Sequence, residues 1–291
     1  MTQGIRIGEL ARRTGLSPDV LRVWERRFKL FTPDRTPGGY RLYTPTDERL
    51  ARDVIALKEQ GIGLAAAVKQ ARSAFEPGAP VPTNEELAKD IDDAVCALDQ
   101  VAVVAAVRRA SHLLGVEAAI VDVFLPYLVV LGHQWETGQV SVAHEHFASH
   151  TIRKHVGALG LDLASAGRRV GIVACPPGER HDIAALMTAV VLSRRGWSVR
   201  FLGADTPLAA IDTVATRVRA DAVVLGGTRR EVFEPLTPLV RRLSGSTQVA
   251  IGGSGASEEL AASIGATLLP SDPVQAVLHL DALVVEPSRS A

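Results

Sequence analysis

The N-terminal quarter of the chain predicts short amphipathic helices separated by turns. Apolar residues in 7–15 recur at helical spacing, and this run closes on a glycine. Ser17 and the proline after it are typical of an N-cap and a first helical position, so a second helix is expected over 18–28. The glycine-rich run 36–43 predicts a turn that leads into a short strand. These elements in this order are typical of a winged helix-turn-helix.

A linker and a helical segment follow. Residues 76–84 hold three prolines and one glycine, which is typical of an extended linker. From 85 to 166, long runs rich in Ala, Val and Leu favour helices, with Pro126 kinking or interrupting the third. We therefore expect a four-helix bundle. The expected helices are 84–97, 99–111, 115–134 and 141–163.

The last segment, 167–291, alternates short apolar runs with amphipathic stretches of helical length. This rhythm predicts a parallel sheet with right-handed crossovers, whose ligands bind at the carboxyl ends of the strands. Strands are expected at 170–174, 198–202, 222–225, 248–251 and 267–269, and helices at 181–195, 207–219, 231–243 and 256–264. The predicted fold class is multidomain α and α/β: a winged helix-turn-helix over 1–75, the linker, the four-helix bundle, and a flavodoxin-like (Rossmann-type) domain.

Composition narrows the class of protein. With 47% hydrophobic and 22% charged residues, the chain is typical of a globular protein, which excludes long disorder and disulfide-stapled miniproteins. No apolar run of about 18 residues is free of charge, so neither a membrane helix nor a membrane partner is expected. The start of the chain lacks a signal-peptide core, which favours a cytoplasmic location. Cys96 and Cys175 are too few for a cysteine zinc site and are expected to be buried, reduced thiols.

The charge is unevenly distributed, although 32 Lys and Arg balance 32 Asp and Glu over the whole chain. Residues 1–75 hold 14 basic and 8 acidic residues, a net charge of +6, and the other 216 hold 18 and 24, a net charge of −6. A basic module joined to an acidic one indicates a nucleic-acid-binding head attached to a second function.

Three stretches of the head occur in order: IGELARRTGLSPDVLRVWERRF, GGYRLYTPTD and VIALKEQGIGL. This set, over roughly residues 5–70, resembles the MerR family of transcription regulators. The resemblance implies that the second helix enters the major groove of operator double-stranded DNA, where Arg22 and Arg26 are the expected base-edge contacts. The other residues expected in the DNA interface, mostly as backbone contacts, are Ser17, Arg27, Arg35, Tyr40, Arg41 and Tyr43. The alternative is a three-helix domain whose arginines are simply solvated.

A proline-glycine loop follows the first expected strand of the sheet and places His181 at its carboxyl edge. Glu179-x-His181-x-x-Ala184 resembles the Asp/Glu-x-His-x-x-Gly motif of cobalamin-binding domains. The resemblance implies that His181 is the lower axial ligand of cobalt and displaces the base of the cofactor. Such a ligand needs its far ring nitrogen held, and both Glu179 and Asp182 are candidate partners. An ordinary surface histidine is the alternative.

Small residues recur where that motif continues. They are Gly226, Gly227, Thr228, Gly252 and Gly253. The resemblance implies that they admit the nucleotide tail of the cofactor between strands and loops. Two departures weaken the match: Ala184 stands where the motif has glycine, and Gly-Gly-Thr replaces its Ser-x-Leu, with Thr228 left to supply a hydroxyl.

The helical segment carries a second pattern, in which nine residues separate Trp135 from Glu145-His146. This pattern resembles the helical cap of CarH/LitR-type photoreceptors, which use adenosylcobalamin. The resemblance implies that Trp135 covers the adenosyl face, with Glu145 and His146 beside it and Val142 as a small apolar contact. The alternative for Trp135 is the core of the bundle.

Two further features bear on this assignment. His144-Glu-His-Phe-Ala148 is not the His-Glu-x-x-His zinc motif, because alanine stands where its second histidine belongs. Glu136 stands where the best-known CarH proteins have a histidine that ligates cobalt after illumination. The illuminated state is therefore expected to carry water, to use another histidine such as His133, or to revert.

The whole chain resembles CarH/LitR. This implies a non-enzymatic, light-responsive repressor that binds adenosylcobalamin, forms a homo-oligomer, tetrameric in the dark, on operator DNA, and is released when light cleaves the cobalt–carbon bond. One alternative is a MerR regulator that senses cobalamin or another ligand without light, which Glu136, Ala184 and Gly226 favour. The other is a corrinoid carrier subunit of a methyltransferase or mutase, for which a DNA-binding head has no use.

Overall fold

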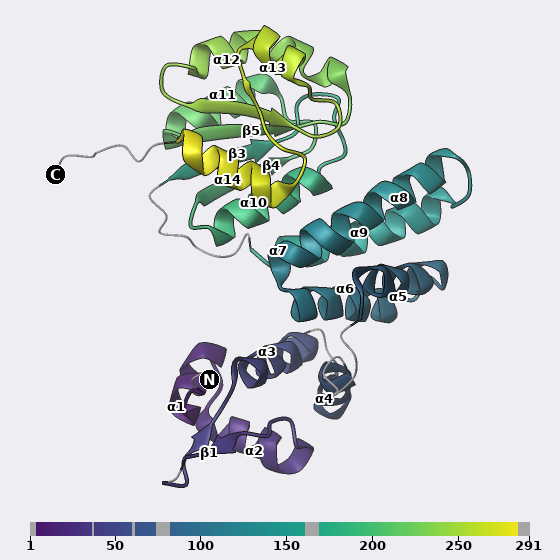
Figure 1. The fold of residues 1–291 in the computed structure, drawn as a ribbon, viewed down its shortest axis with the longest axis vertical. Helices are drawn as coiled ribbons and strands as arrows, with labels where there is room; N and C mark the ends of the chain where they lie inside the picture. The colour runs from purple at the N-terminus through teal and green to yellow at the C-terminus, as the bar shows by residue number, and fades with distance from the viewer. Residues whose placement is uncertain (1–3, 37, 60–61, 74–81, 161–168, 285–291) are drawn as a thin grey trace, which may run out of the picture. The chain divides into compact units, whose positions relative to one another are not determined.

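The structure is a computed structural model that describes residues 4–36, 38–59, 62–73, 82–160 and 169–284. The chain divides into two compact units, Met1–Val81 and Pro82–Ala291. Figure 1 shows the helices and strands of each unit. The predicted linker 76–84 falls largely outside the described residues.

The first unit is the winged helix-turn-helix that the sequence predicts. Ser17 caps the second helix by accepting a hydrogen bond from the amide of Val20 at 3.3 Å, and Gly15 makes the preceding turn at a φ of 72°. The strands of the wing pair antiparallel. The elements are α1 (Ile7–Thr14), α2 (Pro18–Phe28), β1 (Asp34–Arg35), β2 (Arg41–Leu42), α3 (Pro45–Glu59) and α4 (Leu64–Ser73).

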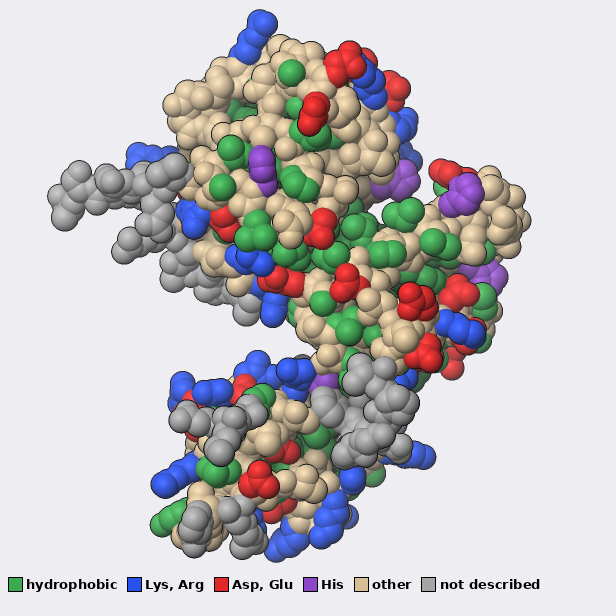
Figure 2. Space-filling model, in the orientation of Figure 1, with side chains coloured by type: hydrophobic (Ala, Val, Ile, Leu, Met, Phe, Trp, Pro, Cys, Tyr) green, Lys and Arg blue, Asp and Glu red, His purple; other side chains and the backbone are tan. Residues whose placement is uncertain are grey.

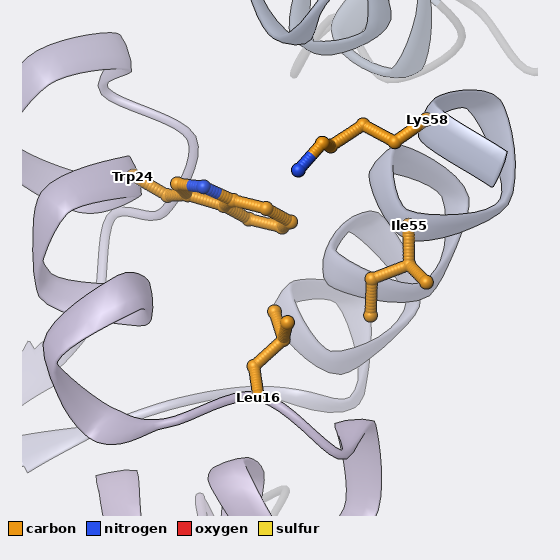
Figure 3. A pocket seen from close by; sticks show the side chains of 4 residues that line it. All are labelled: Leu16, Trp24, Ile55 and Lys58. Carbon is orange, nitrogen blue, oxygen red and sulfur yellow. The ribbon is translucent and has the colours of Figure 1, made fainter. Parts of the chain in front are cut away.

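One pocket of this unit, about 280 Å³, is lined by Leu16, Trp24, Ile55 and Lys58 (Figure 3). The Trp24 side chain is buried in the core of the unit, and the Lys58 amine points toward it. The pocket therefore lies between α3 and α2 with the turn that precedes α2, and it is lined by none of the predicted site residues.

The second unit begins with the helical segment. Thr83 and Glu86 form a reciprocal capping box that starts the first helix. Cys96 lies at the end of that helix and is exposed, so the expectation that both cysteines are buried is wrong for Cys96. The elements are α5 (Asn84–Cys96), α6 (Gln100–Leu114), α7 (Val116–Ala119), η1 (Ile120–Phe124), α8 (Leu125–Glu136) and α9 (Val142–Ala158).

The third long helix is interrupted just before Pro126, close to where the sequence predicts. The interruption is a π-helical turn over Ile120–Phe124, where the amide of Leu125 bonds to the carbonyl of Ile120. Proline lacks the amide that would continue the regular ladder, and a wider turn accommodates the missing bond.

The combined stretch Val116–Glu136 is long and apolar enough to cross a membrane by length and composition, with a mean hydropathy of 1.7. Buried core helices pass the same test. Ile120, Val123 and Phe124 are fully buried within this unit, and 33% of the apolar window is buried overall.

The rest of the second unit is a five-stranded parallel sheet in the order β4-β3-β5-β6-β7, which confirms the flavodoxin-like prediction. The strands are β3 (Val170–Ala174), β4 (Ser198–Gly203), β5 (Ala222–Gly226), β6 (Gln248–Gly252) and β7 (Thr267–Leu268). The helices are α10 (Ile183–Arg194), α11 (Leu208–Val218), α12 (Thr237–Leu243) after two short 3₁₀ turns, η2 (Arg230–Val232) and η3 (Glu234–Leu236), then α13 (Glu258–Ile264) and α14 (Pro273–Leu283).

Candidate functional site

The second helix of the first unit, α2, presents its arginines to solvent. Arg22, Arg26 and Arg27 are exposed, and Arg22 pairs with Asp19 one turn earlier at 2.8 Å. Leu21 and Trp24 on the opposite side are buried. Lys and Arg side chains are numerous on the visible face of this unit (Figure 2), consistent with its net positive charge.

The remaining predicted DNA contacts belong to the wing, where their surroundings differ. Tyr40 is 59% exposed, and the guanidinium of Arg6 stacks on its ring at 4.7 Å. Arg41 pairs with Glu25 of α2 at 2.8 Å, which ties the wing to that helix. The side chain of Arg35 lies outside the described residues.

The structure corrects the expectation for Tyr43. This side chain is 0% exposed, and its hydroxyl donates to Glu25 at 2.7 Å. Burial and the nearby Glu25 carboxylate raise the pKa of Tyr43, so the phenol remains a neutral donor. Tyr43 therefore supports the wing from beneath and has no free surface to offer a phosphate.

We expect Arg22→Ala to weaken binding to a specific duplex by about 10- to 100-fold, because one bidentate base contact contributes about 1–3 kcal/mol. Fluorescence anisotropy with a duplex selected from a random library by the wild-type chain measures this. Arg217→Ala, an exposed arginine of α11 in the second unit, is the matched control. Equal losses in the two variants would contradict the assignment of α2 to the groove.

The loop between β3 and α10 holds His181 in a defined orientation. The Nδ1 atom and the backbone amide of His181 both lie 2.8 Å from Oε1 of Glu179. The imidazole side chain is 71% exposed, whereas the Glu179 side chain is 1% exposed. Because a carboxylate can only accept, Nδ1 carries the proton and the lone pair of Nε2 remains available to a metal.

The other carboxylate oxygen of Glu179 accepts hydrogen bonds from the loop after β5. The amide and the hydroxyl of Thr228 donate to its Oε2 at 2.6 and 2.7 Å. Burial by itself would raise the pKa of Glu179, but the bonds from Thr228 and His181 outweigh it and lower the pKa to about 2. The carboxylate is thus a fixed buried anion behind the histidine, and Thr228, which stands where the motif carries leucine, supplies a hydroxyl to it.

The structure distinguishes between the two candidate partners of His181. Glu179 holds the ring, whereas Asp182 binds Arg153 of α9 through both carboxylate oxygens, at 3.0 and 2.7 Å. Asp182 therefore faces the helical segment. The sequence predicts neither this role of Asp182 nor any role for Arg153, because these two residues lie 29 positions apart and no local motif joins them.

Gly227 and Gly253, directly after β5 and β6, lie against each other, and Gly227 also lies against the protein core. A Cβ atom on Gly227 would approach Val232 and Phe233 to 2.7 Å. Gly253 has a φ of 99°, and a Cβ there would overlap the carbonyl oxygen of Gly227. Packing alone requires glycine at these two positions. Gly226 and Gly252 have more room, because an added Cβ would meet its nearest neighbour at 3.1 and 3.7 Å respectively.

We expect Gly253→Ala to destabilise the ligand-free second unit by about 3 kcal/mol, because it combines a left-handed backbone with a backbone overlap. Gly252→Ala should change stability by less than about 1 kcal/mol, since its methyl meets ordinary contacts. Thermal unfolding of ligand-free protein compares them. A cobalamin-binding defect in the stable Gly252→Ala variant would support a ligand role for Gly252, whereas equal unfolding temperatures would refute the packing argument.

The predicted cap residues lie around the turn between α8 and α9. Trp135 is 42% exposed near the end of α8, and Val142 is 50% exposed at the start of α9. Glu145 accepts from Ser149 and lies 2.5 Å from Nδ1 of His146, whose side chain is largely exposed. Both Trp135 and Val142 are therefore available for contact with a ligand, and the core assignment for Trp135 does not hold.

Helix α9 links these residues to the His181 loop. Arg153, which binds the residue after His181, lies eight positions beyond Glu145 on the same helix. At 1.5 Å per residue, about 12 Å along the helix separates them. No group of three or more His, Cys, Asp or Glu side chains suited to a metal gathers within the described ranges. A corrinoid needs only one protein ligand, and the held imidazole of His181 fits that requirement.

Residues 5–73 match the family described as MerR HTH family regulatory protein, and residues 87–159 and 169–269 match two families described as B12 binding domain. The solved structure of the monomethylamine corrinoid protein of Methanosarcina barkeri resembles the chain with a TM-score of 0.58 at 16% identity, over 69% of this chain and 100% of that one. This likeness shows the fold of the second unit.

Two curated relatives match almost the full length. The chain is 34% identical over 271 residues to the HTH-type transcriptional repressor CarA of Myxococcus xanthus, covering 90% of this chain and 91% of the relative. It is 30% identical over 267 residues to the HTH-type transcriptional repressor CarH of the same organism, covering 86% and 89%. The chain therefore belongs to the family of MerR-type transcriptional repressors with B12-binding domains that includes CarA and CarH.

Proposed function

We propose that the protein is a light-responsive transcriptional repressor. In the dark it binds adenosylcobalamin, assembles into a homo-oligomer, a tetramer by family resemblance, and holds several winged-helix heads on one operator. Illumination removes the adenosyl group, and the oligomer dissociates from DNA. Linked heads bind far more tightly than one head, so assembly controls repression. No enzymatic step is assigned to the chain.

The single observation that carries the cofactor assignment is the held imidazole of His181. Its Nδ1 is fixed by the buried Glu179, and its exposed ring leaves Nε2 free to bind cobalt from the lower face. Thr228 completes this support from the loop after the neighbouring strand β5. An ordinary surface histidine does not need a buried carboxylate partner that is itself held by two hydrogen bonds.

The exposed indole of Trp135 and the Glu145–His146 pair support the adenosyl form and the response to light. Adenosylcobalamin supplies a light-labile cobalt–carbon bond. A flat apolar indole excludes water from that face, and the polar pair on α9 can hydrogen-bond the hydroxyls and ring nitrogens of the adenosyl group. Loss of the group removes these contacts and leaves the cap free to shift.

The test purifies the full-length protein with adenosylcobalamin in the dark and then illuminates it. Absorbance and size-exclusion with light scattering are recorded on the same sample. We expect cofactor uptake with an oligomer in the dark, and a smaller species with an altered spectrum in the light. Absence of uptake, or uptake without any change in size on illumination, would refute the photoreceptor proposal.

A second function, a cobalamin sensor that needs no light, is favoured by Glu136. This residue, at the end of α8, is an exposed carboxylate where the resembling photoreceptors carry a histidine ligand. Uptake of adenosylcobalamin that changes DNA affinity equally in dark and light would favour this sensor over the photoreceptor.

A further inference from the structure

Asp182 lies at a position where an aspartate side chain usually caps the helix that follows. It is the N-cap of α10, yet its side chain makes no capping hydrogen bond there. Both oxygens are instead bound by Arg153 of α9 in a bidentate pair. The Asp182 side chain is 8% exposed, so this ion pair is shielded on the carboxylate side. In the sequence, Asp182 directly follows His181.

A second attachment joins the helical segment to the other end of α10. The hydroxyl of Ser193 donates to the carbonyl of Gly160 at 2.7 Å, and a Cβ on Gly160 would come within 2.8 Å of Val190. Arg195, just beyond α10, pairs with Glu117 at 2.8 Å. The Gly160 contacts form a close-packed join just past the C-terminus of α9, and the Arg195 pair adds a contact to α7.

The two attachments lie far apart along α10. Ser193 lies eleven positions after Asp182, which corresponds to about 16 Å of helix. Between them α9 packs against α10, and buried Val156 of α9 and Met187 of α10 belong to the same hydrophobic core. The ion pair at the start of α10 is the contact that a single substitution can remove without opening that core.

We infer that Arg153 and Asp182 form a latch. It sets the orientation of the helical cap, meaning the ends of α8 and α9 that meet at the turn between them, over the loop carrying His181. Residues of the cap, Glu145 among them, then meet the same cofactor that His181 holds from below. Arg153 is a positioning residue in this arrangement. The inference rests on the proposed cofactor, and it adds a specific consequence: the latch governs contacts on the upper face only.

That consequence gives a selective test with the full-length protein. Arg153→Gln and the isosteric Asp182→Asn, which leaves no unpaired buried charge, should bind hydroxocobalamin with unchanged affinity and an unchanged spectrum of histidine ligation. Affinity for adenosylcobalamin in the dark should fall about tenfold, because only that cofactor reaches the cap. Arg153→Lys should restore part of it. Lys154→Gln, an exposed neighbour on α9, is the matched control.

Combining Arg153→Gln with Trp135→Ala tests whether the latch acts on the cofactor through the cap. If the latch acts through the cap, Arg153→Gln should cost little further adenosylcobalamin affinity once the indole is removed. Additive losses, equal losses of both cobalamins, or losses matched by Lys154→Gln would overturn the inference.

A ligand-free measurement separates failure of the latch from failure of the proposed function. Spin labels at exposed Thr137 on the cap and Thr213 on α11, in a Cys96→Ser background, report the distance between the two parts by pulsed electron paramagnetic resonance. Arg153→Gln should broaden that distance distribution, and Lys154→Gln should not. Absence of cobalamin binding by the wild type would refute only the proposed function, and an unbroadened distribution would refute the latch.

Discussion

His181→Ala is expected to abolish histidine ligation of cobalt and to reduce cobalamin affinity by at least about 100-fold. Altering a residue that merely supports a metal ligand typically costs 10- to 100-fold, so removing the ligand itself should cost no less. Any cofactor still bound should show the spectrum of its own base on cobalt. Absorbance titration with adenosylcobalamin in the dark measures both effects.

The same variant should also lose dark assembly, because the cofactor would no longer stabilise the oligomer at working concentrations. His279→Ala, which removes an exposed histidine of α14, is the matched control and should behave as the wild type. An unchanged histidine-on spectrum in His181→Ala would identify another residue as the ligand and remove the observation on which the cofactor assignment depends.

The sheet could be predicted closely from the sequence because buried parallel strands appear as short, nearly continuous apolar runs. Val170–Ala174 matches its prediction in full, and the other strands differ by a residue at their ends. The prediction for 231–243 was too long, because its prolines permit only 3₁₀ turns before Thr237–Leu243. Helix α14 was missed although Asp272 caps it and a proline begins it.

The site was less predictable, because it depends on contacts between distant residues. The sequence left both Glu179 and Asp182 as candidate partners of His181, and the difference between them comes from Thr228, 49 positions after Glu179, and from Arg153, 29 positions before Asp182. Tyr43 was misassigned for a related reason. Its place beside the exposed wing suggested a surface role, whereas packing on Phe31 and a bond to Glu25 bury it.

Glu179→Gln is expected to destabilise the ligand-free sheet domain by about 3 kcal/mol at pH 7. The pKa of Glu179 is lowered from 4.5 to about 2, and each unit corresponds to about 1.4 kcal/mol. A lowered carboxyl pKa stabilises the fold above the unfolded value, near pH 4.5, and this contribution is lost as the pH falls toward 2. The wild type and the variant should therefore converge in stability across that window.

Hydrogen exchange of the β3 and β5 amides, followed from pH 7 downward with correction for intrinsic rates, reports this domain separately from the rest of the chain. Glu231→Gln, which alters an exposed carboxylate of the same domain, is the control and should show no such pH dependence. Glutamine also leaves Nδ1 of His181 without an anion, so cobalamin affinity should fall by about 10- to 100-fold. A constant stability difference from pH 7 to pH 2 would mean that the carboxylate charge contributes nothing, and that the loop is held by shape alone.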